Sequence, residues 1–353
     1  MNTTNRIKDF FGVKYCSLVG SGTTALYLAL KAINVNNRKV ILPAITCPNV
    51  VVAVIAAGGK PVLSDVNLYD CNISIESVRR AMDSQVKAII AVNSFGYPAD
   101  IDSLREIAEY YGSSIIEDSC QSYGGETDGL KLGNRGDIGI VSFGYSKPID
   151  IGTGGCVLTN VKNTYDRIRK EETSMRIGLI NKIRSTITRK LTFSNKFKGF
   201  AIFAKHFGIL DYGFPEDMHT KLSAVWDKFA SELPIIKENL SILDNTIQSS
   251  KIIDSFAYDK SGWLPWRYSF LLPQKQLRQQ LIDKISSNDV KYSHLYKPIS
   301  AYFPKIQTAD KLLNSREITT SIVNLRYKHD AEDTNNLANK VRSILTNYNP
   351  SSI

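Results

Sequence analysis

The chain has 353 residues, of which 43% are apolar, so it is long enough for one large domain and a smaller one. Its longest apolar stretch, at 50–57, is too short to cross a bilayer, and no apolar segment follows the N-terminal charges, so we expect a cytoplasmic protein. The net charge is +10, but residues 174–210 hold eight basic side chains and no acidic one, which leaves +2 elsewhere. The charge therefore does not predict a nucleic-acid partner.

The cysteines and histidines form no metal-binding pattern. The five cysteines are scattered and never spaced as Cys-x-x-Cys, so neither a disulfide framework nor a zinc site is predicted. The four histidines contain no His-Glu-x-x-His or similar ligand pair. We therefore expect no metal in this protein.

The first 160 residues alternate short apolar runs with helical patterns, which is typical of a parallel sheet fed by crossover helices. The expected strands are 14–19, 39–44, 60–66, 87–94, 113–119, 138–143 and 155–159. The expected helices are 23–33, 48–58, 73–84 and 100–112. The fold class is α/β with a mainly parallel sheet, and in such folds ligands bind beyond the carboxyl ends of the strands.

A basic segment, 176–210, follows, in which isoleucine, leucine and phenylalanine recur at helical spacing among lysines and arginines. Its apolar stripe either packs on the protein itself or a partner subunit, or lies on anionic lipid as a peripheral contact at the inner face of the membrane.

The remainder of the chain predicts a smaller α+β domain. It begins with a long helix at 216–249 and ends with a helix at 333–345, and strands are expected at 289–294 and 318–327. We place the large domain at 1–212, with the basic segment as an insertion, and the small domain at 213–353.

The sequence GSGTTA, at 20–25, stands between a strand and a helix and formally matches a dinucleotide fingerprint. The next strand lacks the acidic residue that would hold a ribose hydroxyl, and there is no Gly-Lys-Ser/Thr of a P-loop. A helix N-terminus around Gly22 and Thr23 suits a phosphate monoester as well as a pyrophosphate. The alternative is a capped helix with no ligand.

Three further loops follow strand ends. The strand 113–119 carries Glu117 and Asp118, with Gln121 just beyond, while Ser142 lies near the end of a later strand and Lys147 in the loop after it. The third loop follows the strand 39–44. Taken singly, a strand-end aspartate can serve as a turn residue and a loop lysine can be merely solvated.

Together these stretches resemble the pyridoxal-phosphate enzymes of fold type I, and specifically the DegT/StrS-type sugar aminotransferases. The resemblance runs over 10–160 in order and spacing, through SGTTAL, LPAIT, AGGKPVLSDV, VNSFGYPADIDSL, IIEDSCQ and GTGG. It is weaker in the last third, where HLYKPI and IVNLRY carry it. The resemblance implies a fold type I structure, pyridoxal 5'-phosphate as cofactor and a homodimer.

The resemblance also implies roles for single residues. Lys147 is the amine that condenses with the cofactor aldehyde, and Asp118 is the carboxylate that keeps the ring nitrogen protonated. Gln121 packs near the ring's phenolic oxygen. The phosphate is held by Gly22, Thr23 and Ser142, and the cofactor-binding set is completed by Thr46 and Cys47.

The implied reaction moves an amino group from an amino acid, by resemblance glutamate, to a keto-sugar linked to a nucleotide, as in amino-sugar and surface-polysaccharide biosynthesis. Three positions depart from the family pattern: Cys47 replaces a ring-stacking aromatic residue, Asn93 a histidine and Pro215 an asparagine. Two alternatives remain open. One is a pyridoxal-dependent sugar dehydratase, against which Lys147 argues because such relatives carry histidine there, and the other is a cofactor-binding regulator or scaffold without turnover.

Overall fold

The computed structural model describes residues 3–173, 213–249, 264–271, 275–288, 290–293 and 297–346. The basic segment 176–210, and with it both interpretations of its apolar stripe, lies outside these residues. Among the helices that the structure describes, none combines the length and apolar character needed to span a bilayer.

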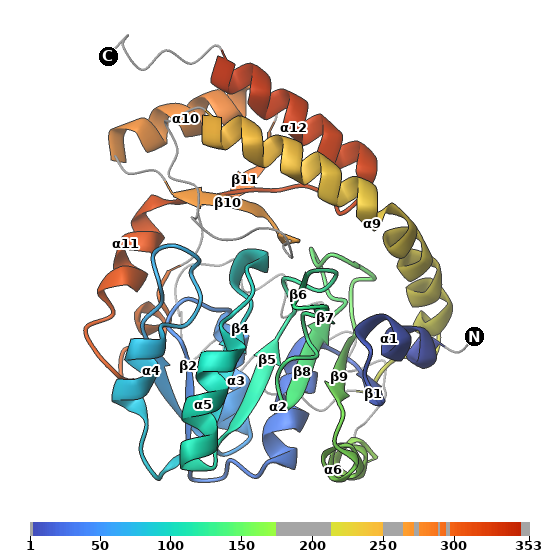
Figure 1. Ribbon diagram of the computed structural model, residues 1–353, viewed down its shortest axis with the longest axis vertical. Helices are drawn as coiled ribbons and strands as arrows, with labels where there is room; N and C mark the ends of the chain where they lie inside the picture. Colours follow the sequence, from blue (N-terminus) through green and yellow to red (C-terminus); the bar gives the residue numbers. More distant parts are fainter. Residues whose placement is uncertain are drawn as a thin grey trace.

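An eight-stranded sheet forms the centre of the molecule (Figure 1). Its spatial order is β1 (Tyr15–Val19), β9 (Gly155–Thr159), β8 (Ile138–Ser142), β5 (Ser114–Asp118), β4 (Val86–Val92), β2 (Lys39–Pro43), β3 (Lys60–Ser64) and β12 (Gln307–Thr308). Only β9 runs antiparallel to its neighbours, β1 and β8. A two-stranded hairpin, β6 (Glu126–Thr127) with β7 (Leu130–Lys131), lies outside the sheet. The mainly parallel α/β sheet expected from the sequence is confirmed.

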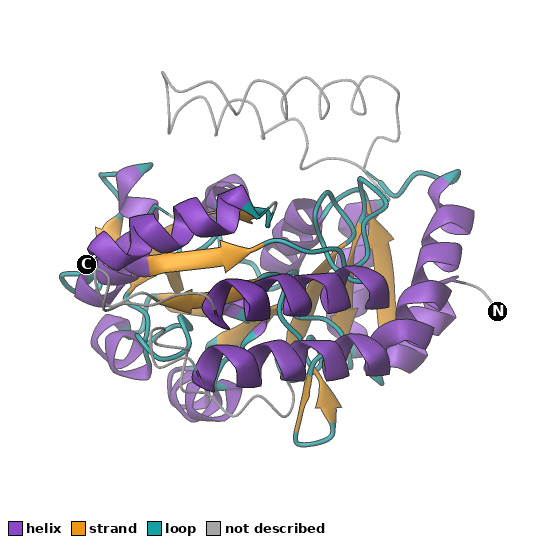
Figure 2. Ribbon diagram, turned by 90° about the horizontal axis from the view of Figure 1, so that it is seen from above, coloured by secondary structure: helices purple, strands orange, loops and turns teal. Residues whose placement is uncertain are grey.

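Helices cover both faces of the sheet because its strands are apolar on both sides (Figure 2). The helices of the first half are α1 (Thr3–Phe11), α2 (Gly22–Ala32), α3 (Pro48–Ala56), α4 (Ile75–Ala81), α5 (Ile101–Tyr111) and α6 (Lys162–Glu172). Leu42 packs with residues of α2 and α3, whereas its neighbour Ile41 packs with residues of α4 and α5. This alternation is the period of two that a strand imposes on its side chains.

Local sequence sets the ends of these helices. Ser21 caps α2 by accepting from the amide of Thr24 at 3.0 Å, and Asp100 caps α5 by accepting from Ser103 at 3.0 Å. α3 begins at a proline, whose missing N–H costs nothing at the first helical position. α5 ends at Gly112, which adopts a left-handed φ of 65°.

The last part of the chain builds a three-stranded antiparallel sheet in the order β10 (Tyr268–Leu271), β13 (Ile322–Leu325), β11 (Tyr292–Ser293). Its helices are α9 (Met218–Ser249), α10 (Lys275–Ser287), α11 (Leu313–Ser321) and α12 (Ala331–Thr346). α9 and α12 lie side by side (Figure 1).

The strand expected at 318–327 is partly wrong. α11 continues through Ser321, and only 322–325 is a strand. The hydroxyl groups of Thr320 and Ser321 donate back to the carbonyl of Glu317, which allows these polar residues to remain helical. Within the strand expected at 289–294, residues 292–293 form β11, while 289 and 294 lie outside the described residues.

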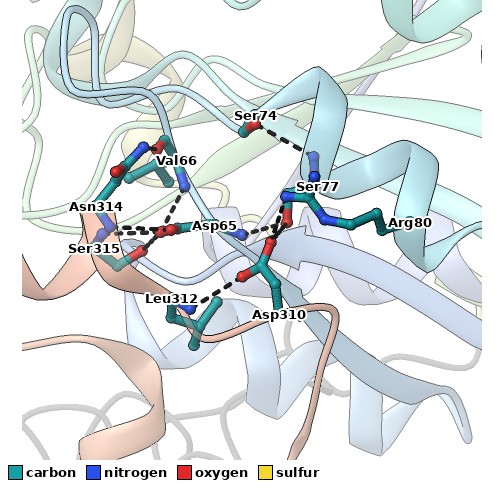
Figure 3. A network of polar contacts seen from close by, with 9 residues as sticks. All are labelled: Asp65, Val66, Ser74, Ser77, Arg80, Asp310, Leu312, Asn314 and Ser315. Carbon is teal, nitrogen blue, oxygen red and sulfur yellow. Dashed lines mark hydrogen bonds and ion pairs between the residues drawn. The ribbon is translucent and has the colours of Figure 1, made fainter.

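A polar network fastens the C-terminal segment to the edge of the large sheet (Figure 3). Asp65, just after β3, accepts from the amides of Asn314 and Ser315 at 3.0 and 2.8 Å and so caps the start of α11. Asp310 accepts from Ser77 at 2.6 Å and pairs with Arg80 at 2.9 Å. These contacts join residues more than 200 positions apart.

The C-terminal segment that this network holds at the sheet edge also brings the short helix Ile299–Ala301 against the end of β2. The amide of Ile299 donates to the carbonyl of Ala44 at 2.8 Å. Tyr302 therefore reaches the loop that follows β2, and its pKa is raised by burial and by the nearby Cys47 thiol.

Candidate active site

The first element of the site is the start of α2. A Cβ on Gly22 would stand 2.7 Å from the Cβ of Ser142 and 3.2 Å from the sulfur of Cys120. Only glycine allows the helix N-terminus to approach this closely, so the structure brings Gly22 and Ser142 together at the ends of β1 and β8. Thr23 lies half-buried in the same turn. Cys120 is a neighbour of this site that the sequence analysis missed.

The loop after β2 contributes Thr46 and Cys47. Thr46 is buried, while Cys47 keeps contact with solvent and precedes the first residue of α3. Desolvation by surrounding protein nevertheless raises the pKa of the Cys47 thiol, opposed by the positive charge of Lys147 and reinforced by the negative charge of Asp118. The Cys47 thiol therefore lies near enough to Lys147 and Asp118 for both of their charges to act on it.

The end of β5 carries two acidic residues with different surroundings. Asp118 is buried on the side of the site and accepts from the amide of Cys120 at 3.0 Å. Glu117 points to the opposite side, where it accepts from Asn93 at 2.9 Å and from the amide of Arg135 at 2.8 Å. Glu117 is therefore a structural anchor, whereas the charge of Asp118 acts on the thiols of Cys47 and Cys120.

Gln121 is buried just beyond β5. Its side-chain oxygen accepts from the amide of Phe95 at 2.9 Å, in a turn where Phe95 adopts a left-handed φ of 55°. Asn93, which replaces the histidine of the family pattern, accepts from Ala99 at 2.8 Å and donates to Glu117. Both side chains hold the loop after β4 against the end of β5.

Lys147 lies in the loop after β8 and is half-buried. Asp150 shapes this loop by accepting from the amides of Ser146 and Gly152 at 2.7 and 2.8 Å. The Lys147 ammonium lies 5.1 Å from the ring centroid of Trp266 and also influences the pKa values of Cys47 and Cys120. The predicted site residues thus stand beyond the carboxyl ends of β1, β2, β5 and β8, where Gly22 approaches Ser142 and the charges of Lys147 and Asp118 act on Cys47.

Several aromatic residues around this site escaped the sequence analysis. Trp266, Tyr302, Tyr327 and His329 come from the last third of the chain and follow no local motif that names them. Their signal in the sequence was the weak resemblance of HLYKPI, which precedes Tyr302, and of IVNLRY, which ends at Tyr327. Trp266 reaches Lys147 and Tyr302 reaches Cys47 because the last third of the chain folds back onto the edge of the large sheet.

His329 is half-buried and donates from Nε2 to the carbonyl of Pro265, 3.2 Å away. Desolvation lowers its pKa to about 4, and the charges of Arg267 and Lys147 act in the same direction. The Pro265 carbonyl and Asp330 oppose the shift. His329 is therefore neutral at physiological pH, and acid should weaken the fold through this residue.

We expect wild-type protein to lose about 2 kcal/mol of unfolding free energy through His329 between pH 7.5 and pH 5, because the unfolded state takes up the proton first. His329→Gln keeps an N–H donor but does not titrate. The free energy of unfolding of both proteins is measured with urea at both pH values. The buried Asp70 carboxyl, with a pKa of about 6, stabilises the folded state as the pH falls, but it does so equally in both proteins. The difference between the two proteins therefore isolates the contribution of His329. Identical pH dependence in the two proteins would contradict the expectation.

The chain is similar to known proteins in sequence over its first half and in fold over its length. It is 34% identical over 153 residues to the GDP-perosamine synthase of Vibrio cholerae. These residues are 43% of this chain and 42% of that protein, so the match spans less than half of the relative. A DegT DnrJ EryC1 StrS aminotransferase from Brucella abortus superimposes with a TM-score of 0.74 at 22% identity, over 98% of this chain and 88% of that one.

A second solved structure, E. coli GDP-4-keto-6-deoxy-D-mannose-3-dehydratase with bound hydrated PLP, gives a TM-score of 0.73 at 19% identity, over 97% of this chain and 90% of that one. At these identities the structural likeness shows the fold alone, and it confirms the fold type I architecture that the sequence resemblance implies. The sequence model of the DegT/DnrJ/EryC1/StrS aminotransferase family matches residues 4–198, more than half of the chain. The chain therefore belongs to the DegT/DnrJ/EryC1/StrS aminotransferase family.

Proposed function

We propose that this protein is a pyridoxal-phosphate-dependent aminotransferase that moves an amino group from glutamate to a keto-sugar linked to a nucleotide. The observation that carries the proposal is the meeting of an amine, a buried carboxylate and a glycine-lined helix N-terminus, from Lys147, Asp118 and Gly22, at the carboxyl ends of the strands. Amine, carboxylate and phosphate cradle are the three contacts that this cofactor requires.

The described residues fit both the phosphate and the ring of pyridoxal phosphate. The space at Gly22, which a Cβ would fill, lies beside the Ser142 hydroxyl, and backbone amides at a helix start favour a phosphate. Asp118 is buried and would hold a proton on the ring nitrogen through its charge, while Gln121, Thr46 and Cys47 would line the ring.

When bound, the cofactor supplies a carbonyl carbon that takes up the amino group and a conjugated ring that takes up an electron pair. Lys147 would bind the cofactor through Nζ. Once displaced by the donor, the same nitrogen would remove the proton from the amine-bearing carbon of the amino acid and return it to the cofactor. Asp118 would pair with the positively charged ring nitrogen.

The name of the Vibrio cholerae relative, GDP-perosamine synthase, supports a nucleotide-linked sugar as the acceptor. A role in making amino sugars for polysaccharide is part of the same proposal. We further propose a cytoplasmic homodimer in which residues 1–212 bind the cofactor and residues 213–353 form the small domain. For the basic segment 176–210 the proposal keeps two alternatives: its apolar stripe packs on the protein or a partner subunit, or it makes a peripheral contact with the membrane.

The test begins with the absorption spectrum of the protein loaded with pyridoxal phosphate. L-Glutamate should convert the cofactor to its aminated form with release of 2-oxoglutarate, and a keto-sugar nucleotide should reverse the conversion and yield an aminated sugar. A deoxy-sugar without a new amine would identify a dehydratase. A bound cofactor that no amino acid converts would identify a protein without turnover, and either result would overturn the proposal.

We expect Gly22→Ala to weaken binding of pyridoxal phosphate by about tenfold, or about 1.4 kcal/mol, because the added Cβ pushes the helix start away from Ser142. Equilibrium dialysis of cofactor-free protein measures the affinity. Pyridoxal, which lacks the phosphate, serves as the matched ligand and should lose little affinity. An equal loss for both ligands would show that Gly22 does not act on the phosphate.

A further inference from the structure

Two glycines in loops that follow strands of the large sheet make room for a segment from the last third of the chain. Gly96 adopts a φ of +98°, and a Cβ there would overlap Pro265. Gly124 adopts a φ of +101°, and its Cβ would stand 2.7 Å from a methyl group of Leu264. Leu264 is fully buried between these contacts. The segment 264–267 is therefore fitted closely against the loops after β4 and β5.

The backbone of the same segment is held from its other side. The carbonyl of Pro265 accepts from the hydroxyl of Tyr327 and from Nε2 of His329. The two aromatic rings lie 4.8 Å apart and are both half-buried, so this carbonyl has two neighbouring donors from one loop. Steric fit and hydrogen bonds together fix the direction in which the next residue points.

That next residue is Trp266, and it points at Lys147. The indole N–H donates to the carbonyl of Ser146, the residue before the lysine. The Lys147 ammonium lies 5.1 Å from the ring centroid, within the range of a cation–π interaction. The guanidinium carbon of Arg267 lies 4.1 Å from the same ring. One side chain thus contacts both the backbone and the amine of the Lys147 loop.

We propose that Trp266 is a positioning residue for Lys147: it fixes the loop through the Ser146 carbonyl and holds Nζ close to the indole ring. Nζ is thereby kept on the side of the site where its charge acts on Cys47. The inference rests on the proposed function for its catalytic consequence, whereas the contact between Trp266 and Lys147 can be tested without the cofactor. Without the indole, the four-carbon chain of Lys147 regains its rotamer freedom, and Nζ spends less time where it can capture or return a proton.

The first test needs no cofactor. In a double-mutant cycle, Lys147→Met should change the intrinsic tryptophan fluorescence of the wild-type protein, because removal of the ammonium alters the field at the indole. The same substitution should leave the fluorescence unchanged in a Trp266→Phe background. Equal changes in both backgrounds would overturn the contact, whatever the protein's activity.

The second test measures single-turnover conversion of the bound cofactor by glutamate. We expect Trp266→Leu to lower the rate constant by about tenfold with little change in glutamate affinity, and Trp266→Phe to recover part of the loss because a ring remains for Nζ. Trp226→Phe, in the core beside Phe10 and Phe143, is the matched control and should keep the wild-type rate. A wild-type rate in Trp266→Leu would overturn the positioning role.

The two tests separate the inference from the proposed function. A fluorescence change that depends on Trp266, in a protein whose cofactor glutamate does not convert, would retain the contact and reject the aminotransferase. Conversion by glutamate at an unchanged rate in Trp266→Leu would retain the aminotransferase and reject the role of Trp266.

Discussion

Lys147→Arg is expected to lower the amino-transfer rate by about ten-thousand-fold while the protein remains folded. Arginine keeps the positive charge and the length of the side chain, so the contact with the Trp266 ring can persist. Its guanidinium stays protonated at any working pH, so it can neither attack a carbonyl carbon nor accept a proton from the donor. The substitution therefore separates the chemistry of the amine from its charge.

The rate is measured as single-turnover release of 2-oxoglutarate from glutamate. Lys221 offers a matched control, because it is another lysine of the same region whose Nζ donates to the carbonyl of Ile151 at 3.0 Å. Lys221→Arg keeps that donor and should retain a rate within about twofold of wild type. A rate in Lys147→Arg within tenfold of wild type would show that another group performs the chemistry.

Asp118→Asn is expected to lower the same rate by about a thousand-fold and to leave the fold intact. Asparagine has nearly the same shape, and its oxygen can still accept from the amide of Cys120. What is lost is the negative charge that would keep a proton on the ring nitrogen, and without that proton the ring withdraws electrons poorly. The expected defect is in turnover, with cofactor binding much less affected.

Glu117 supplies the comparison, because it is the adjacent acid on the same strand and faces the opposite way. Its Oε2 accepts from the amides of Arg135 and Gly136 at 2.8 and 3.1 Å. Glu117→Gln should therefore lower the urea midpoint of unfolding, since an NH₂ group would face those donors, but the turnover of the folded fraction should persist. Equal loss of turnover in the two variants would remove the distinction between them.

The local pattern of the sequence was sufficient for the large sheet. Apolar runs of strand length and helical periodicities predicted seven strands and four helices, and the structure has an element at each place, because both patterns are set by neighbours along the chain. The boundaries moved where capping decided them: α4 begins only at Ile75, after the Ser74 side chain accepts from the amide of Ser77. The strand expected at 318–327 failed because short side chains with hydroxyl groups can satisfy a helix equally well.

The sequence by itself determined which residues stand at the strand ends, from Gly22 to Lys147, and the family to which the chain belongs. Only the tertiary structure decided that Glu117 binds the amide of Arg135, that Cys120 lies beside Gly22, and that Trp266 reaches Lys147 from 119 positions away. A local pattern specifies period and length, whereas the approach of two distant segments depends on which surfaces exclude water together and which polar groups then find partners. That choice is made by the whole fold, through contacts such as those of Asp65 and Pro265.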